Sequence, residues 1–181
     1  VATGYGGKIA YSPDGINWTL VSDSKFGPSN VYGICYGNGK FVAGGYEGKM
    51  AYSPDGINWT LVSDSKFDSS YINDACYGNG RFIAVGVRGK VACSSNGVIW
   101  TLASNSRFGT FEVNSICYGN GKFVAVGESG KIAYSSDAIN WTSVSDSKFG
   151  SSTIYGVCYG SGKFVAAGNG GKIAYSPDGI N

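Results

Sequence analysis

Apolar residues occur along the chain in short runs of four to six residues that return at a fixed spacing. One unit contains four of them, at residues 31–36, 40–44, 49–52 and about 58–62. Short runs rich in β-branched and aromatic residues, separated by Gly, Asn and Ser, are typical of β-strands. No stretch shows the 3.6-residue periodicity of an amphipathic helix. The pattern therefore predicts an all-β protein with four strands, A to D, in each unit.

A two-residue turn signal separates strands A and B. In the four copies it stands at Asn38-Gly39, Asn79-Gly80, Asn120-Gly121 and Ser161-Gly162. Asn-Gly between two apolar runs is the strongest short signal for a β-hairpin, because both central residues must take positive φ. Strands A and B are therefore expected to be antiparallel neighbours.

The unit repeats without insertion or deletion. Its tetrad Gly-Lys-apolar-Ala begins every 41 residues, at Gly7, Gly48, Gly89, Gly130 and Gly171. After four periods, residues 165–181 copy residues 1–17 with two differences, at positions 167 and 169. The chain is therefore interpreted as a single domain, residues 1–181, made of about 4.4 tandem repeats and cut from a longer array.

The strands are apolar on both faces, which requires cover from both sides. In residues 122–127 one face carries Phe123 and Ala125 and the other carries Val124 and Val126. One four-stranded unit cannot cover itself, but units stacked around an axis cover each other. A period of about 40 residues with four strands is in the range of a β-propeller. We expect a β-propeller of 41-residue, four-stranded antiparallel blades.

The strand count leaves two blade numbers open. The chain begins with B-C-D, runs three times through A-B-C-D and ends with A-B-C, which is two strands more than four blades and two fewer than five. Five blades are favoured over four. Incomplete terminal blades leave unpaired edges, so we expect a homo-oligomer or a parent chain with more repeats.

The turn between strands C and D has a recurrent sequence, Ser-Pro-Asp-Gly-Ile-Asn-Trp. Its Ser and Asp side chains are expected to accept hydrogen bonds from backbone N–H groups, its Gly permits positive φ, and its Trp is expected to pack between blades. We expect a structural role for Ser12, Asp14, Trp18, Ser53, Asp55, Trp59, Ser94, Asn96, Trp100, Ser135, Asp137, Trp141, Ser176 and Asp178. Asn96 lacks the carboxylate, and Ala138 replaces Gly and is expected to relax its turn.

This turn resembles an Asp-box that is one residue shorter. The chain as a whole resembles bacterial repeats of sialidase-type and photosystem II assembly-factor-like propellers, through segments such as Tyr-Gly-Asn-Gly-Lys-Phe-Val-Ala-Val-Gly at residues 118–127 and the Ser-Pro-Asp-Gly turn. The resemblance extends over every residue. It implies a propeller fold, and its assembly-factor-like members imply a protein-binding scaffold as one function.

The sequence provides no set of catalytic residues. Sialidase activity would need an arginine cluster, an acidic residue and an activated Tyr, whereas the three arginines, Arg81, Arg88 and Arg107, are residues of different strands and loops of the repeat. There is no His, the usual general base and metal ligand. Glu47, Glu112 and Glu128 could act only if folding brought two of their carboxylates together. We expect no enzymatic activity, no cofactor and no metal site.

Charge and cysteine content limit the partners. Fourteen basic and twelve acidic residues give a net charge of +2 without a run of one sign, so nucleic acid is not expected, and no apolar stretch predicts membrane insertion. Four cysteines occupy one position of strand A in successive units, at Cys35, Cys76, Cys117 and Cys158. They are expected to remain free, with Cys93. Free thiols favour a reducing compartment, while a secreted or cell-surface location stays open.

Antiparallel strands place the A–B and C–D turns on one face, the constant face, and the B–C turns and D–A loops on the other, the variable face. The constant face repeats the same residues in every unit, whereas the variable face changes from unit to unit, so any ligand is expected there. The second residue of strand A is expected to point toward the central funnel. The candidate ligand-binding residues are Tyr32, Asn73, Asp74, Asn114, Tyr155, Tyr46, Arg88 and Glu128.

Two functions remain open for the variable face. Tyr rings beside Asn, Asp and Glu suit sugar stacking and hydroxyl recognition, so the leading hypothesis is a non-catalytic, multivalent, lectin-like module for glycans. The alternative is a protein-binding or assembly scaffold. Repeated loop segments such as Asp64-Ser65-Lys66-Phe67 would then offer cations beside aromatic rings.

Overall fold

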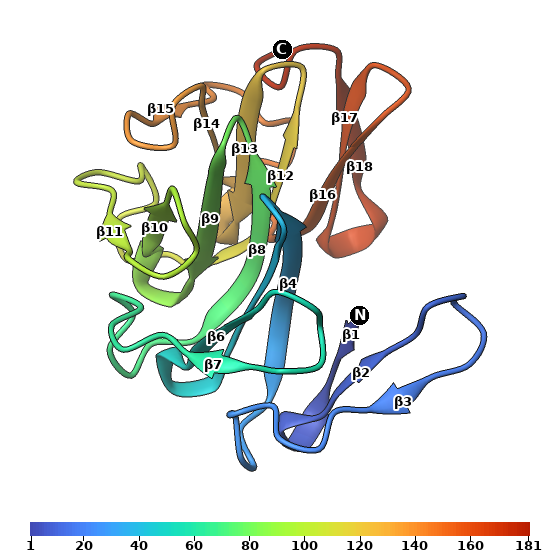
Figure 1. Ribbon diagram of the computed structural model, residues 1–181. Helices are drawn as coiled ribbons and strands as arrows, with labels where there is room; N and C mark the ends of the chain where they lie inside the picture. The colour runs from blue at the N-terminus through green and yellow to red at the C-terminus, as the bar shows by residue number, and fades with distance from the viewer.

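The computed structural model describes residues 1–181 and contains only β-strands, short 3₁₀ turns and loops (Figure 1). The eighteen strands form five antiparallel sheets, or blades, in chain order. The three central blades have four strands each. Blade 2 comprises β4 (Val31–Gly37), β5 (Lys40–Gly45), β6 (Met50–Ser53) and β7 (Thr60–Leu61); blade 3 comprises β8 (Ile72–Gly78), β9 (Arg81–Gly86), β10 (Val91–Ser94) and β11 (Thr101–Leu102); blade 4 comprises β12 (Val113–Gly119), β13 (Lys122–Gly127), β14 (Ile132–Ser135) and β15 (Thr142–Ser143).

The two end blades have three strands each. Blade 1 comprises β1 (Ala2–Thr3), β2 (Ile9–Tyr11) and β3 (Thr19–Leu20) and has no strand A, while blade 5 comprises β16 (Ile154–Gly160), β17 (Lys163–Gly168) and β18 (Ile173–Ser176) and has no strand D. The expected strand order and the five blades are therefore confirmed. Strand D is shorter than predicted, because residues 58 and 59 still belong to the preceding turn.

The blades follow one another around an arc, with the strand A of each blade beside that of the next (Figure 1). These inner strands are β4, β8, β12 and β16, and each pairs within its own blade with the following strand B. Strand pairing occurs within each blade and joins no two blades. No helix has the length and apolar character needed to cross a membrane.

The A–B hairpins have the predicted backbone. Asn38 and Gly39 have φ of 46° and 70°, and the corresponding residues of the other hairpins have similar values. Each strand A also contains a bulge at its second residue, as at Tyr32 in β4, which has no partner in the register between Val31 and Gly33. The bulge sets apart the position that the sequence marked as a candidate for binding.

The C–D turns carry the predicted hydrogen bonds. In blade 2, Ser53 Oγ accepts from Gly56 N at 2.9 Å, and Asp55 Oδ1 accepts from Ile57 N and Asn58 N at 2.8 Å each. Asn58 Nδ2 donates to the second carboxylate oxygen at 2.7 Å. The backbone and side-chain bonds from Asn58, followed by the bond from Ile57, lower the pKa of Asp55 well below its usual value. The turn therefore satisfies its own backbone donors.

The two copies that depart from the turn sequence keep its geometry. Asn96 Oδ1 accepts from Val98 N and Ile99 N at 2.9 Å each, in place of a carboxylate. Ala138 has φ of 65°, close to the values of the glycines at the same position. The expectation of a relaxed fourth turn is wrong, because Ser135 Oγ still accepts from Ala138 N at 2.9 Å and holds the residue in the left-handed region.

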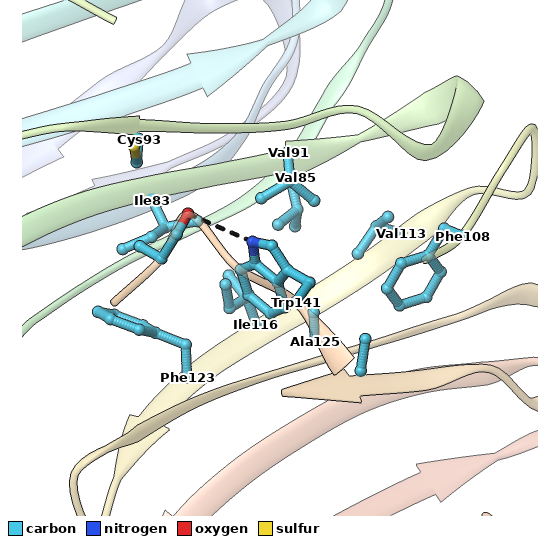
Figure 2. Packing of buried hydrophobic residues seen from close by; sticks show 12 residues of the cluster. Ile83, Val85, Val91, Cys93, Phe108, Val113, Ile116, Phe123, Ala125 and Trp141 are labelled. Carbon is cyan, nitrogen blue, oxygen red and sulfur yellow. Dashed lines mark hydrogen bonds between the residues drawn. The ribbon is translucent and has the colours of Figure 1, made fainter. Parts of the chain in front are cut away.

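In blades 2, 3 and 4 the Trp of the turn lies between two blades, as predicted, whereas Trp18 of blade 1 is 50% exposed. Trp141 is 2% exposed and, in Figure 2, lies among Ile83 and Val85 of blade 3 and Ala125 of its own blade. Its Nε1 donates to Ala138 O at 3.3 Å. The core is therefore built by contacts between neighbouring blades.

All five cysteines are free, in agreement with the sequence. Burial, and then the charge of Asp74, raises the pKa of Cys35 to about 12, and burial also raises that of Cys117 to about 12. Both thiols stay protonated at neutral pH, where they are weak nucleophiles.

Candidate functional site

The variable face brings its two kinds of loop into pairs. Each B–C turn is a 3₁₀ turn whose middle residue has positive φ: η1 (Tyr5–Gly7), η2 (Tyr46–Gly48), η3 (Val87–Gly89), η4 (Glu128–Gly130) and η5 (Asn169–Gly171). In η2 to η5 the first residue of the turn donates its N–H to the carbonyl oxygen of the last residue of a D–A loop, as Tyr46 N does to Asn30 O at 2.9 Å and Val87 N to Tyr71 O at 3.1 Å. These contacts use backbone atoms only, so the side chains there are free to differ.

Three tyrosines gather between blades 2 and 3. The rings of Tyr46 and Tyr71 are stacked, with centroids 4.7 Å apart and planes at 28°. The ring centroid of Tyr32, in β4, lies 6.4 Å from that of Tyr71. A side-chain hydrogen bond with Tyr46, and then the negative charges of Glu47 and Glu112, raise the pKa of Tyr71, which therefore stays neutral at physiological pH. We call Tyr32, Tyr46 and Tyr71 the tyrosine cluster.

Acidic residues lie next to the tyrosine cluster. Glu128 Oε2 accepts from Glu112 N at 3.0 Å, which brings the two glutamates of blade 4 together. Partial burial, and then the negative charge of Glu128, raises the pKa of Glu112. An open cleft of about 410 Å³ is lined by both glutamates together with Tyr71 and Arg88. The cleft therefore combines an aromatic wall with an excess of negative charge.

Two predicted site residues act as contacts between inner strands. Asn73 Nδ2 donates to Val113 O at 3.0 Å, and Asn114 Nδ2 donates to Ile154 O at 2.8 Å. Both carbonyl groups belong to the next blade. These amides therefore fasten each strand A to its neighbour.

Asp74 also bridges two blades near the axis. Its carboxylate accepts from Ser115 Oγ at 2.9 Å, from Ile116 N at 3.0 Å and from Ala75 N at 2.8 Å. Burial raises its pKa, although the three hydrogen bonds oppose that shift. The carboxylate of Asp74, a predicted ligand-binding residue, thus makes its hydrogen bonds to the protein itself.

The remaining predicted site residues divide between the cluster and blade 5. Tyr32, Tyr46, Arg88 and Glu128 belong to the tyrosine cluster or to the cleft. Tyr155, in β16, is 61% exposed and lies outside both. Tyr71, Glu47 and Glu112 are not among the predicted ligand-binding residues, although the sequence places their loops on the variable face. The signal was their departure from the other copies, since Asn30 and Thr153 occupy the position of Tyr71.

Solved structures of β-propellers are similar to this chain. YCF48 bound to D1 peptide has 19% identity and a TM-score of 0.68 and covers 96% of this chain. The WD40 beta propeller domain of Doa1 has 14% identity and a TM-score of 0.64 and covers 98%. The fold is that of a β-propeller.

A third propeller-like neighbour is an enzyme, the GH74 enzyme of Niastella koreensis, with 18% identity, a TM-score of 0.62 and 98% of this chain covered. The chain spans 58% of the YCF48 chain, 60% of the Doa1 domain and 28% of the GH74 enzyme. No protein-family model and no curated protein sequence matches the chain. At these identities the comparisons establish the fold.

Proposed function

We propose that the chain is a non-catalytic binding module that holds an extended, basic protein segment against the tyrosine cluster and the neighbouring acidic cleft. The observation that carries the proposal is the stacked pair Tyr46–Tyr71 beside Glu112 and Glu128, on the face where the repeats differ. The structural neighbour YCF48, which is bound to a peptide in its solved structure, supports a protein ligand.

The chemistry of the cleft favours a segment with Lys or Arg. Three carboxylates, those of Glu47, Glu112 and Glu128, lie around the tyrosines, with one cation, Arg88, among them. A guanidinium or ammonium group is attracted both by carboxylates and by the faces of aromatic rings. The extended peptide also lies along the rings of the tyrosine cluster and adds apolar contact there. Such a ligand matches both properties of the cleft.

The non-catalytic part of the proposal rests on how the carboxylates are used. Glu128 Oε2 accepts from the backbone N–H of Glu112, and the carboxylate of Asp74 accepts from three protein donors near the axis. A hydrolytic pair would instead need one free acid and one free base or nucleophile across a substrate bond. These contacts suit fixed recognition surfaces.

The test is titration with immobilised peptides that carry a basic, neutral or acidic centre in one common sequence. We expect the basic series to bind, and Tyr71→Ala and Glu112→Gln each to weaken binding at least about tenfold, or about 1.4 kcal/mol. Tyr5→Ala is the matched control, because Tyr5 occupies the position of Tyr46 in blade 1 and is 82% exposed. Equal binding of acidic and basic peptides, or equal loss in the control, contradicts the proposal.

A lectin-like function is the second candidate, and one observation favours it. Tyr32 and Tyr155 occupy the same strand A position in blades 2 and 5 and are 42% and 61% exposed, so two ring faces are accessible for sugar stacking. Glycan-array binding that Tyr32→Ala and Tyr155→Ala both abolish would support it. A silent array with a folded protein would exclude it.

A further inference from the structure

The two end blades expose side chains whose counterparts in the central blades are buried or half-buried. On the face of each blade that points toward the next one, Val42, Ile83 and Val124 are at most 2% exposed, whereas Val165, at the same position of blade 5, is 36% exposed. At the neighbouring position of strand C, Met50 and Val91 are 1% exposed and Ile132 is half-buried, whereas Ile173, in a blade without strand D, is 73% exposed. We call Val165, Ile173 and Tyr175 the trailing surface.

The internal blade contacts show what normally covers such a surface. The methyl group Cγ2 of Val1 lies against Gly56 in the turn of blade 2, and the same pairing recurs between Val42 and Gly97. It recurs once more between Val124 and Gly179. In each interface the turn of one blade closes over the preceding blade, and in blades 2, 3 and 4 the Trp of that turn, Trp59, Trp100 or Trp141, is buried there.

Blade 1 carries the same turn without a blade to cover. No atom lies within 4 Å of the position that a Cβ on Gly15 would take, and Trp18 is 50% exposed, against 4% for Trp59. We call Gly15 and Trp18 the leading surface. Leading and trailing surfaces are thus the two halves of one interface that the chain already forms between its own blades.

We propose that the trailing surface of one copy of this chain packs against the leading surface of a second copy. The contact continues the internal series, with Val165 against Gly15 of the second copy and Trp18 of the second copy over Ile173. The internal interface also contains a polar contact, because Lys40 Nζ donates to Asn96 O of the next blade at 3.0 Å. Lys163 of blade 5 and Asp14 of blade 1 occupy the corresponding positions, so the same contact is expected between Lys163 of one copy and Asp14 O of the second.

A second copy fits this surface better than the chain's own blade 1. The two end blades lie at opposite ends of the arc (Figure 1), so the trailing surface of blade 5 and the leading surface of blade 1 belong to different ends of the chain's own fold. Contact between two different surfaces is heterologous, so it joins copies head to tail and either closes a ring or grows further.

The test uses two variants that each destroy one surface. Light scattering of the unaltered chain is expected to show a mass that rises with concentration above the 18.8 kDa of one copy. Ile173→Asp and Trp18→Asp alone are each expected to stay at the mass of one copy, with association at least about tenfold weaker. A mixture of the two is expected to form a two-copy complex, since each variant supplies the surface that the other lacks.

The controls separate this contact from other causes. Leu61→Asp alters an exposed apolar residue, 49% exposed, on a central blade, and is expected to associate like the unaltered chain. The circular dichroism melt of all three variants is expected to stay unchanged, because the altered side chains are exposed. A mass of one copy at every concentration overturns the proposal. Iodide quenching of Trp18 then tells whether that single copy leaves Trp18 open to solvent or shields it by closing its own two ends. Failure of the mixed variants to combine overturns it too.

Discussion

The constant and variable faces are built by the same repeat, but they hold their turns in different ways. On the constant face, the side chains of Ser53, Asp55 and Trp59 make the turn and fill the space between blades. On the variable face, the B–C turn and the D–A loop are joined by backbone groups, as between Tyr46 N and Asn30 O. Side chains that form the turn and the interblade contact must be similar in every repeat. Side chains beside a backbone contact can differ between repeats, and can therefore form a binding site in one of them.

Removal of an interblade Trp on the constant face should have the largest effect. Trp100 is 2% exposed, so Trp100→Ala leaves a cavity between blades 2 and 3 and is expected to lower the free energy of unfolding by about 3–5 kcal/mol. Trp18→Ala is the matched control, because Trp18 is half exposed. Urea unfolding measures both. Equal losses would mean that interblade burial does not determine stability.

A methyl group added between the inner strands should have the next largest effect. A Cβ on Gly78 would overlap the ring of Tyr118 of the next blade, so Gly78→Ala is expected to cost about 1–3 kcal/mol. Gly160 holds the same position in blade 5 with nothing within 4 Å, and Gly160→Ala is expected to be neutral or slightly stabilising. Thermal melts of the two variants measure the difference. An equal change in melting temperature in both would contradict the inferred packing.

The aspartates of the constant face should give the protein an acid-sensitive stability. Hydrogen bonds lower the pKa of Asp14, Asp55, Asp137 and Asp178 in the folded chain. A lowered pKa contributes stability above the unfolded value of about 4, and this stability is lost as the pH falls below it. Blade 3 already has Asn at this position, Asn96. Replacement of all four aspartates by Asn is therefore expected to make the free energy of unfolding depend less on pH in the acid range. Unfolding between neutral and acid pH measures the change; an unaltered slope contradicts it.

Substitution in the tyrosine cluster should change stability least. Tyr71 is 38% exposed on the variable face, and Tyr71→Ala is expected to change the free energy of unfolding by no more than about 0.5 kcal/mol. The same change is expected to abolish most peptide binding, so stability and function separate on this face. A large loss of stability in urea would assign the ring a structural role.

The repeating parts of the fold were predictable from the sequence because their causes are local. Asn38-Gly39 forces positive φ, and Ser53 and Asp55 supply acceptors two or three residues from the donors that need them. The turn around Ala138 was mispredicted, because the cost of positive φ was weighed without the hydrogen bonds that hold the residue there. The repeat could predict the number of blades, but the separation of the end blades depends on the angle between sheets, which no single repeat encodes.

The candidate site was predictable only as a face. The sequence placed Tyr46 and Arg88 there, but the stack of Tyr46 on Tyr71 joins a turn of blade 2 to the loop that leads into blade 3. Asn73 and Asn114 share the position of Tyr32, yet their shorter side chains reach the next strand and make hydrogen bonds instead. Which of two roles a repeated position takes therefore depends on the side chain that occupies it, Tyr or Asn.

Amide chemical-shift mapping with a basic peptide tests the central claim most directly, since it reports on both faces at once. The account predicts shifts at Tyr46, Tyr71, Arg88, Glu112 and Glu128, with the turns at residues 53–59 and 94–100 unchanged and Tyr71→Ala removing the shifts. Shifts centred on those constant turns, or an unaltered spectrum at saturating peptide, would contradict it.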